Sequence, residues 1–333
     1  MTVHTRDTSV PTPTTAPAGH EAPSGTVRPP AAGSRGRLTK HSTAGEVLLA
    51  YLDAQAARLS VLDVAVRRDK PDAVHQMRVT VRRLRAALQS FTEILPGEDT
   101  EQLRGELKWL GGVLGAARDT EVLAGQLHAA LAALPLELVI GPAQARVTTH
   151  FASREATTRQ EVLDALDSQR YRDLRAALAR LLSAPPLTPA AAEPAARVLP
   201  VAVARACRRT SRRMRRARRA PAGGARDMAL HEARKAAKRA RYAAEAAAPG
   251  LGKQRQGKAR RLAKRMKGVQ SVLGAHQDAV ITRAEARDIG VHAHLAGENA
   301  FSFGLLHERA HHQVLATEDR ARRAWRRARK SRL

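Results

Sequence analysis

An eleven-residue stretch at residues 75–85 places a histidine and several arginines at helical spacing. Its sequence is His-Gln-Met-Arg-Val-Thr-Val-Arg-Arg-Leu-Arg. On an α-helix, with about 100° between successive residues, Arg78, Arg82 and Arg85 fall on the same side as His75. The apolar residues of the stretch fall on the opposite side, which is typical of a helix with one buried face. Guanidinium groups donate paired hydrogen bonds to phosphate or carboxylate oxygens, so the charged face suits an anion.

The stretch occurs a second time at residues 231–241, as His-Glu-Ala-Arg-Lys-Ala-Ala-Lys-Arg-Ala-Arg. The two copies are 156 residues apart, and the histidine and basic positions agree. In the helix expected next, an offset of 159 pairs Gly115 with Gly274 and Asp119 with Asp278. An internal repeat of this kind indicates two related structural units. We therefore expect two helical bundles packed face to face in a pseudo-two-fold relation.

The charge balance indicates an anionic partner. The chain has 333 residues with 58 Lys and Arg against 31 Asp and Glu, for a net charge of +27. Such a charge opposes folding by self-repulsion unless counter-ions or an anionic partner offset it. Nucleic acid, anionic lipid and inorganic polyanions are the candidate partners. Aromatic residues make up only 3% of the chain, which disfavours single-stranded nucleic acid because its recognition relies on base stacking.

Cysteine content and hydropathy predict a cytoplasmic protein without membrane contact. Cys207 is the only cysteine, so the chain has no intramolecular disulfide, as is typical of a reducing compartment. The N-terminal residues lack the apolar core of a signal peptide. No stretch approaches the roughly 20 apolar residues of a membrane span.

The apolar periodicity predicts an all-α fold behind a disordered N-terminal tail. Residues 1–40 are rich in Pro, Thr, Ser, Gly and Ala and are expected to be disordered. The first half covers 41–184 and the second half covers 195–328, with prolines between them. The expected helices of the first half run from the Ser-Thr cap at 42–43 to about 68, from 71–72 to about 96, from about 103 to 115, from 119 to 134, and over about 143–183. Those of the second half cover about 196–219, the stretch from the turn at 221–224 to about 248, the stretch from 249–250 up to 274, the stretch from 278, and about 298–329.

These motifs resemble those of the CHAD family, the conserved histidine α-helical domains. The resemblance rests on the two repeated stretches, on Leu-Gly-Ala-Ala-Arg-Asp at 114–119, on Tyr242, and on Leu-Gly-x-x-x-Asp at 273–278. It covers about residues 41–328 and implies two four-helix bundles around a basic central cavity. It also implies binding of inorganic polyphosphate, often at intracellular polyphosphate granules. The motif has departures in the second half: Arg118 corresponds to Gln277, and Lys238 stands where the first half has Arg82.

The residues expected to contact polyphosphate are histidines and basic side chains of both halves. They are His75, Arg78, Arg82, Arg83, Arg85, Lys108, Arg118, Arg205, Arg209, Arg212, His231, Arg234, Lys235, Lys238, Arg239, Arg241 and Lys267.

Four of the repeated side chains have two interpretations each. His75 and His231 either donate a hydrogen bond to phosphate or pack as neutral residues that orient an arginine. The sequence favours Asp119 and Asp278 as helix N-caps. Their alternative role is to hold an arginine of the repeated helix in place.

No catalytic, metal or cofactor site is expected. The chain has no Gly-x-x-x-x-Gly-Lys-[Ser/Thr] loop and no acidic cluster suited to magnesium. His307 and His311 have the i, i+4 spacing of metal ligands, but the sequence offers no third ligand. The Glu-x-Glu-x-Lys motif of the triphosphate-tunnel domain, which accompanies many CHAD domains, is also absent. We therefore expect non-catalytic binding of polyphosphate, with sequence-independent nucleic-acid binding as the alternative.

Overall fold

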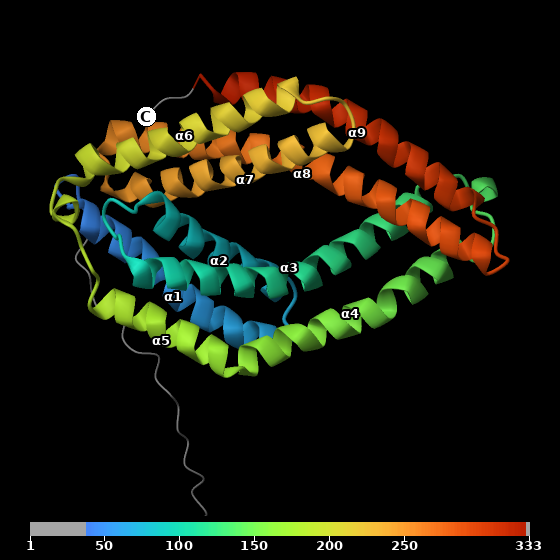
Figure 1. Cartoon of the computed structure of the whole chain (residues 1–333), viewed down its shortest axis with the longest axis horizontal. Helices are drawn as coiled ribbons and strands as arrows, with labels where there is room; N and C mark the ends of the chain where they lie inside the picture. Colours follow the sequence, from blue (N-terminus) through green and yellow to red (C-terminus); the bar gives the residue numbers. More distant parts are fainter. Residues whose placement is uncertain (1–37, 331–333) are drawn as a thin grey trace, which may run out of the picture. The chain divides into compact units, whose positions relative to one another are not determined.

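The computed structural model describes residues 38–330, and their regular structure is helical (Figure 1). The predicted disordered tail at 1–40 therefore lies outside the described residues, except for residues 38–40. Within 38–330 the only extended pairing is an isolated bridge between Thr43 and Pro194. The all-α prediction is confirmed.

Nine α-helices occupy the described range, five before the proline-rich segment and four after it. The first five are α1 (Ala44–Arg67), α2 (Ala73–Ser90), α3 (Glu98–Ala132), α4 (Ala143–Asp167) and α5 (Gln169–Ser183). The others are α6 (Ala195–Arg219), α7 (Gly224–Ala247), α8 (Lys253–Leu295) and α9 (Phe301–Ala328).

The N-terminal ends of two helices show how local sequence sets their bounds. Thr43 and Glu46 form a capping box at α1, in which the Thr43 hydroxyl accepts from the Glu46 amide and the Glu46 carboxylate accepts from the Thr43 amide. The predicted cap at 42–43 is thus confirmed. Ser168 caps α5 by accepting from the Tyr171 amide. The predicted helical stretch over 143–183 has these bounds and consists of two helices, because Ser168 takes extended backbone and separates α4 from α5.

The end of α2 also differs from the sequence prediction. The helix ends at Ser90 rather than near residue 96. Phe91, Ile94 and Leu95 then turn inward and are at most 1% exposed. The amides of Ile94 and Leu95 bond back to the Phe91 carbonyl. Burial of these three apolar side chains in a turn replaces the last expected turn of helix.

The largest correction concerns α3 and α8, which are continuous. The sequence predicted breaks at Gly115 and Gly274, with Asp119 and Asp278 capping new helices. Both glycines and both aspartates instead lie inside helices, so the capping prediction was wrong. Neither glycine has a positive φ angle, so no helix end is formed there. At each glycine an arginine side chain lies against the helix, as described below.

Two four-helix bundles contain the main core. The first comprises α1, α2, α5 and the N-terminal part of α3, and the second comprises α6, α7, the N-terminal part of α8 and the C-terminal part of α9 (Figure 1). Buried residues of both bundles form one continuous apolar cluster. Because α3 and α8 continue, their C-terminal parts meet α4 and the start of α9 in a separate core that includes Leu127, Phe151, Ile289 and Phe303.

The two halves also meet at equivalent positions of the backbone. The Ala44 amide donates to the Glu193 carbonyl at 2.8 Å, and the Ala195 amide donates to the Ser42 carbonyl at 3.0 Å. These bonds join the start of α1 to the start of α6. Further into the molecule α2 packs against α7, so the two repeated stretches are brought together.

Candidate anion-binding site

The apolar side of each repeated helix is buried, which turns the basic side away from the core of its bundle. Met77, Val81, Leu84 and Leu88 on α2 are at most 1% exposed. On α7 the corresponding side consists of alanines, which are buried in the same core. Small alanine side chains let α7 approach its neighbours closely while it carries a dense row of charges.

Four cations meet where α2 passes α7, and we call them the axial cations: Arg78, Arg82, Arg234 and Lys238. Lys238 is influenced electrostatically by the other three. Arg82 is influenced in turn by Arg78 and Arg234 and interacts with the Tyr242 hydroxyl. The offset of 156 exchanges Arg78 with Arg234 and Arg82 with Lys238. Arg82 and Lys238 therefore face one another at the pseudo-two-fold axis.

Burial makes these charges costly. Desolvation, reinforced by the neighbouring arginines, lowers the pKa of Lys238 to about 7. Burial also lowers the pKa of Arg82 from its ordinary value. A group of cations held out of water in this way is stabilised by any anion that comes among them.

Two aspartates accompany the axial cations, one from each half. Asp119 accepts two hydrogen bonds from Arg78, at 2.7 and 3.1 Å. Asp278 lies near Arg234, and burial raises the pKa of its carboxyl. Asp119 therefore has the alternative role considered above: it holds Arg78 of the repeated helix in place.

The two helix-interior glycines lie directly against the axial arginines. A Cβ atom built on Gly115 would be 3.3 Å from Nη2 of Arg78, and one on Gly274 would be 3.4 Å from Nη2 of Arg234. Both distances are at or below the limit of ordinary contact, so a side chain here would press on the guanidinium. Glycine at these two positions thus sets where Arg78 and Arg234 lie.

Several arginine donors have no acceptor. The Nε atoms of Arg82, Arg83, Arg118 and Arg234 are buried and lack a hydrogen-bond partner among residues 38–330. Buried donors are almost always paired in folded proteins. The shortage of acceptors shows that the protein's own carboxylates do not fully match this basic region.

The two histidines lie beside the axial cations in equivalent surroundings. Nδ1 of His231 is 2.8 Å from Oε1 of Gln277. His75 is influenced by Arg118, which corresponds to Gln277 in the repeat. Burial lowers the pKa of both imidazoles. Both side chains are half-buried, so contact with a ligand and packing stay alternative predictions.

Arg85 does not lie with Arg78 and Arg82, although one helical face carries all three. It belongs to a group contributed by four helices, which we call the arginine cluster. Its members are Arg85 of α2, Arg104 of α3, Arg209 and Arg213 of α6, and Arg239 of α7. Burial, followed by the other four arginines, lowers the pKa of Arg239 to about 10. Burial, with Arg104, also lowers the pKa of Arg85.

The opposite flank of the α2–α7 contact contains a carboxylate. Glu245 accepts from Nε of Arg241 at 2.7 Å and from Nη2 of Arg83 at 3.4 Å. We call this region the Glu245 flank. Beside it is a pocket of about 380 Å³ whose lining includes Arg260, Lys264 and Lys267. Lys267, one of the predicted site residues, therefore lies here.

The remaining predicted residues lie farther out. Lys108, Arg212 and Lys235 are exposed. Two of these outlying cations have carboxylate partners of their own: Arg205 pairs with Glu93 and Lys235 with Glu232. Arg118, which lies near His75, pairs with Glu121.

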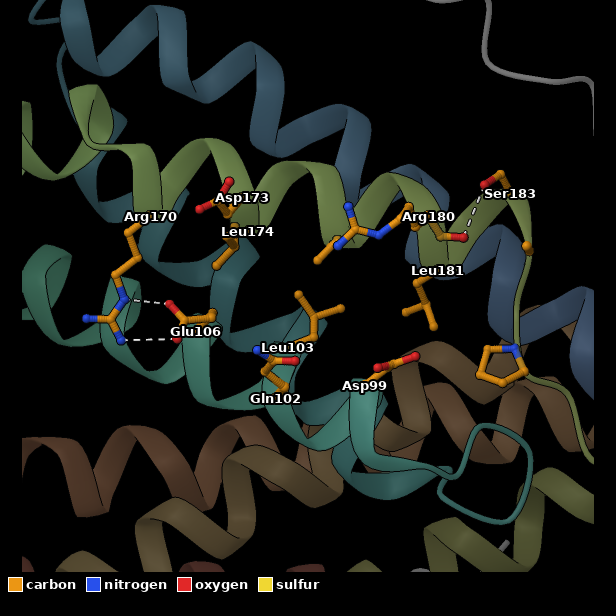
Figure 2. A pocket seen from close by; sticks show the side chains of 13 residues that line it. Asp99, Gln102, Leu103, Glu106, Arg170, Asp173, Leu174, Arg180, Leu181 and Ser183 are labelled. Atoms are coloured by element: carbon orange, nitrogen blue, oxygen red, sulfur yellow. Dashed lines mark hydrogen bonds and ion pairs between the residues drawn. The ribbon is translucent and has the colours of Figure 1, made fainter.

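A second pocket lies elsewhere and has a different character. It has a volume of about 660 Å³ and lies between α3 and α5 (Figure 2). Leucines and the carboxylates of Asp99, Glu106 and Asp173 contribute to its lining. Arg170 is occupied by two bonds to Glu106, at 2.6 and 3.1 Å (Figure 2). None of the predicted anion-binding residues lines this pocket, and its acidic lining disfavours a polyanion.

Sequence reasoning missed three residues of these groups. Arg104 and Arg213 belong to the arginine cluster, and Glu245 neutralises two predicted site residues. Arg213 was one of many arginines on the same helix, and periodicity alone did not distinguish it. Arg104 lies four residues before the predicted Lys108, and its spacing from that lysine is the signal that could have identified it.

Within residues 38–330 the structure contains no group of three or more side chains placed to hold a metal. His307 bonds to the Arg283 carbonyl, and His311 lies 3.1 Å from the Arg283 guanidinium. None of the described helices has the length and apolar character needed to cross a bilayer.

Comparison with known proteins decides the family. Residues 50–287 match the family model of the CHAD domain. The chain belongs to the CHAD family. A crystal structure of the CHAD domain from the plant Ricinus communis superposes with a TM-score of 0.64 and 27% identity, over 87% of this chain and 94% of that one. PptA from Streptomyces chartreusis superposes with a TM-score of 0.71 and 24% identity, over 86% of this chain and all of that one, which supports the fold.

Two curated relatives come from Mycobacterium tuberculosis, the uncharacterized proteins MT2285 (strain CDC 1551 / Oshkosh) and Rv2226 (strain ATCC 25618 / H37Rv). Each is 36% identical to this CHAD chain over 257 residues, which is 76% of this chain. The aligned region is 47% of each relative. The chain thus spans about half the length of the curated relatives it matches.

Proposed function

We propose that this CHAD protein binds inorganic polyphosphate between α2 and α7, without turning it over, and associates with polyphosphate granules in the cytoplasm. The observation that carries the proposal is the group of axial cations, which outnumbers the two aspartates beside it. A linear polyanion supplies closely spaced oxygens to Arg78, Arg82, Arg234 and Lys238 together. Family membership supports the same ligand class.

The arrangement of donors suits phosphate in particular. Guanidinium groups offer paired donors that match two oxygens of one phosphate. The axial arginines are already oriented, Arg78 by Asp119 and Gly115 and Arg234 by Gly274. Preorganised donors lose less conformational freedom on binding, which favours a defined site over a diffuse positive surface.

Competition between polyanions tests the proposal. Long-chain polyphosphate with a fluorescent end label is bound to the protein, and unlabelled polyphosphate or duplex DNA of equal total phosphate is added. The proposal predicts that DNA displaces the label at least about tenfold less effectively. We expect polyphosphate to make at least two charged hydrogen bonds that DNA does not make, each contributing about 1 kcal/mol or more. Equal displacement by DNA would favour sequence-independent nucleic-acid binding instead.

A separate assay addresses turnover. The protein is incubated with Mg²⁺ and long-chain polyphosphate, and released phosphate and chain length are measured over time. Binding without turnover predicts no release above the protein-free control. Release in proportion to protein concentration, removed by substitution of the axial cations, would make the protein an enzyme.

A further inference from the structure

We propose that two copies of this chain associate through an apolar surface at one end of the molecule, distant from the axial cations. We call this surface the apolar tip. It belongs to the connection between α3 and α4, the C-terminal turns of α8 and the first residue of α9. Its exposed side chains are Leu136, Ile140, Val291, Leu295 and Phe301. The association of two copies goes beyond the proposed function and does not depend on it.

Hydrogen bonds bring the segments of the tip together, although 162 residues separate Ile140 from Ser302. The Ile140 amide donates to the Ser302 hydroxyl at 2.9 Å, and that hydroxyl donates to the Leu138 carbonyl at 2.9 Å. Arg146 at the start of α4 donates to the His292 carbonyl at 2.6 Å. The connection between α3 and α4 therefore lies against the end of α8 and the start of α9, at the end of the molecule where α8 leads into α9 (Figure 1).

The side chains of the tip are unusually exposed and rigidly supported. Leu136 and Leu295 are 87% and 77% exposed, more than any other large apolar side chain among the described residues. The separate core of α3, α4, α8 and α9 lies beneath them. A Cβ on Gly290 would be 3.0 Å from the Phe303 Cβ, so α8 and α9 are in close contact there. Exposed apolar surface that is gathered in one place marks a contact site on a soluble protein.

The charge of the tip identifies its partner. The segments that form it, 133–146 and 287–309, contain four acidic residues and three arginines, whereas the whole chain has a net charge of +27. Two copies repel each other through their basic surfaces, and the repulsion is smallest when they meet through ends without a positive surplus. A symmetric contact, in which the same surface serves both copies, buries the apolar side chains and keeps the basic surfaces apart.

An anionic bilayer fits the tip less well than a second copy does. Surfaces that lie on such bilayers combine apolar side chains with free Lys or Arg. The arginines of the tip segments have partners within the protein: Arg146 bonds to Glu298 at 3.3 Å, Arg287 to Asp288 at 3.2 Å, and Arg309 to the Ala133 carbonyl at 3.3 Å. Their charges are therefore engaged and do not complement lipid headgroups.

Sedimentation of the ligand-free protein tests the proposal. The wild type is freed of polyanions by a high-salt wash and is measured over a wide range of protein concentration, at low and at high salt. The proposal predicts a monomer–dimer equilibrium that high salt strengthens, because salt screens the repulsion between the copies and not the apolar contact. A wild type that stays monomeric at its highest soluble concentration would overturn the proposal. Self-association that weakens with salt would overturn it as well.

Two pairs of substitutions locate the contact. Leu136→Glu/Leu295→Glu should weaken dimerisation at least about tenfold, because the contact would then bury carboxylates without partners. Val61→Glu/Val64→Glu adds the same charge at exposed apolar positions of α1 and should leave dimerisation unchanged. Leu136→Ser/Leu295→Ser adds no charge, should also weaken dimerisation, and serves if the glutamates disturb the fold. Equal weakening by the tip and α1 pairs, or dimerisation that survives both tip pairs, would contradict a contact at the tip.

Vesicles of phosphatidylcholine and phosphatidylglycerol separate the second copy from a bilayer. The net charge of the chain draws it to such vesicles, so the two glutamate variants should bind them alike. Weaker vesicle binding by Leu136→Glu/Leu295→Glu than by Val61→Glu/Val64→Glu would overturn the proposal and assign the tip to the bilayer.

Polyphosphate separates this proposal from the proposed function. Gly274, which contacts the axial Arg234, lies about 30 Å along α8 from Leu295, so a tip contact leaves the axial cations of both copies accessible. Short polyphosphate should bind Leu136→Glu/Leu295→Glu as tightly as the wild type. A long chain that reaches both copies should bind the wild type more tightly, an expectation that rests on the proposed function. Dimerisation without polyphosphate binding would refute the proposed function alone, and polyphosphate binding by a monomeric wild type would refute the dimer alone.

Discussion

The axial cations of the two halves lie at equivalent backbone positions but differ in their carboxylate partners and in one side chain. In the first half Arg78 is fixed by two bonds to Asp119, whose side chain is 67% exposed. In the second half Arg234 lies near Asp278, which is partly buried and whose carboxyl pKa is raised by that burial. At the pseudo-two-fold axis the first half supplies an arginine, Arg82, and the second half supplies Lys238.

The two halves therefore place a basic side chain at the same position, but the two side chains differ in whether they lose a proton near neutral pH. An arginine stays charged at any physiological pH. A lysine loses its proton when burial and like charges lower its pKa, and for Lys238 that value is about 7. The second half can therefore change its charge near neutral pH, whereas the first half cannot.

The largest effect is expected on the pH dependence of polyphosphate affinity when Lys238 is replaced by arginine, the residue at the equivalent position of the first half. In the wild type, anion binding should restore the proton of Lys238, so the affinity for polyphosphate should fall by up to about tenfold per pH unit above 7. Lys238→Arg should remove most of this fall, because Arg82 shows that the pseudo-equivalent position accepts arginine. Affinity measured by fluorescence anisotropy between pH 7 and 9 checks the prediction. The pKa of His75 and of His231 is lowered, so both titrate below this range.

The pH dependence of the stability of the ligand-free protein tests the titration of Lys238 independently. The pKa of Lys238 is lowered on folding, so the unfolded chain binds more protons between pH 7 and the ordinary lysine value. The free energy of unfolding should therefore rise with pH in this window, and Lys238→Met should reduce the rise. An identical pH profile for the wild type, Lys238→Met and Lys238→Arg would show that Lys238 does not titrate there.

A smaller effect is expected from the glycines that contact the axial arginines. Gly115→Ala and Gly274→Ala should displace Arg78 and Arg234 by a few tenths of an ångström. We expect a loss of about 0.5–1 kcal/mol in polyphosphate binding, or roughly two- to fivefold. Thermal stability should be unchanged or higher, because alanine favours a helix interior by up to about 1 kcal/mol over glycine.

Gly112→Ala is the matched control for the glycine variants. Gly112 lies on α3 less than one turn before Gly115, and a Cβ there would meet no atom within 4 Å. It should gain helix stability without loss of affinity. A similar loss of affinity in all three variants would mean that the glycines act through the helices and not through the arginines.

Much of the fold followed from the sequence because it depends on periodicity. The apolar spacing correctly placed Met77, Val81, Leu84 and Leu88 in the core, and the repeat indicated two related bundles. The continuity of α3 and α8 did not follow. A glycine inside a helix and a glycine at its end look alike in sequence, and the arginine that lies against Gly115 comes from another helix.

The grouping of the charges could be predicted only in part. Periodicity places Arg78, Arg82 and Arg85 on one face of α2, but it does not say what crosses that face. Because α7 passes α2 near Arg82, residues one turn further along lie on separate flanks, Arg85 with Arg239 and Arg241 with Glu245. The direction in which two helices pass each other is a tertiary property, and single-helix patterns do not contain it.

The most direct test of the central claim compares two variants that lose the same charge. At about pH 6, below the pKa of Lys238, the axial triple Arg82→Gln/Arg234→Gln/Lys238→Gln and the exposed triple Arg323→Gln/Arg326→Gln/Arg329→Gln each remove three cations. Polyphosphate affinity is measured for both at several salt concentrations, with helicity checked by circular dichroism. Oriented, charged hydrogen bonds contribute about 1.5–3 kcal/mol and exposed charges under about 1 kcal/mol. We predict that the axial triple weakens binding at least about tenfold more than the exposed triple, whereas equal losses would show that net charge alone accounts for binding and that α2 and α7 form no site.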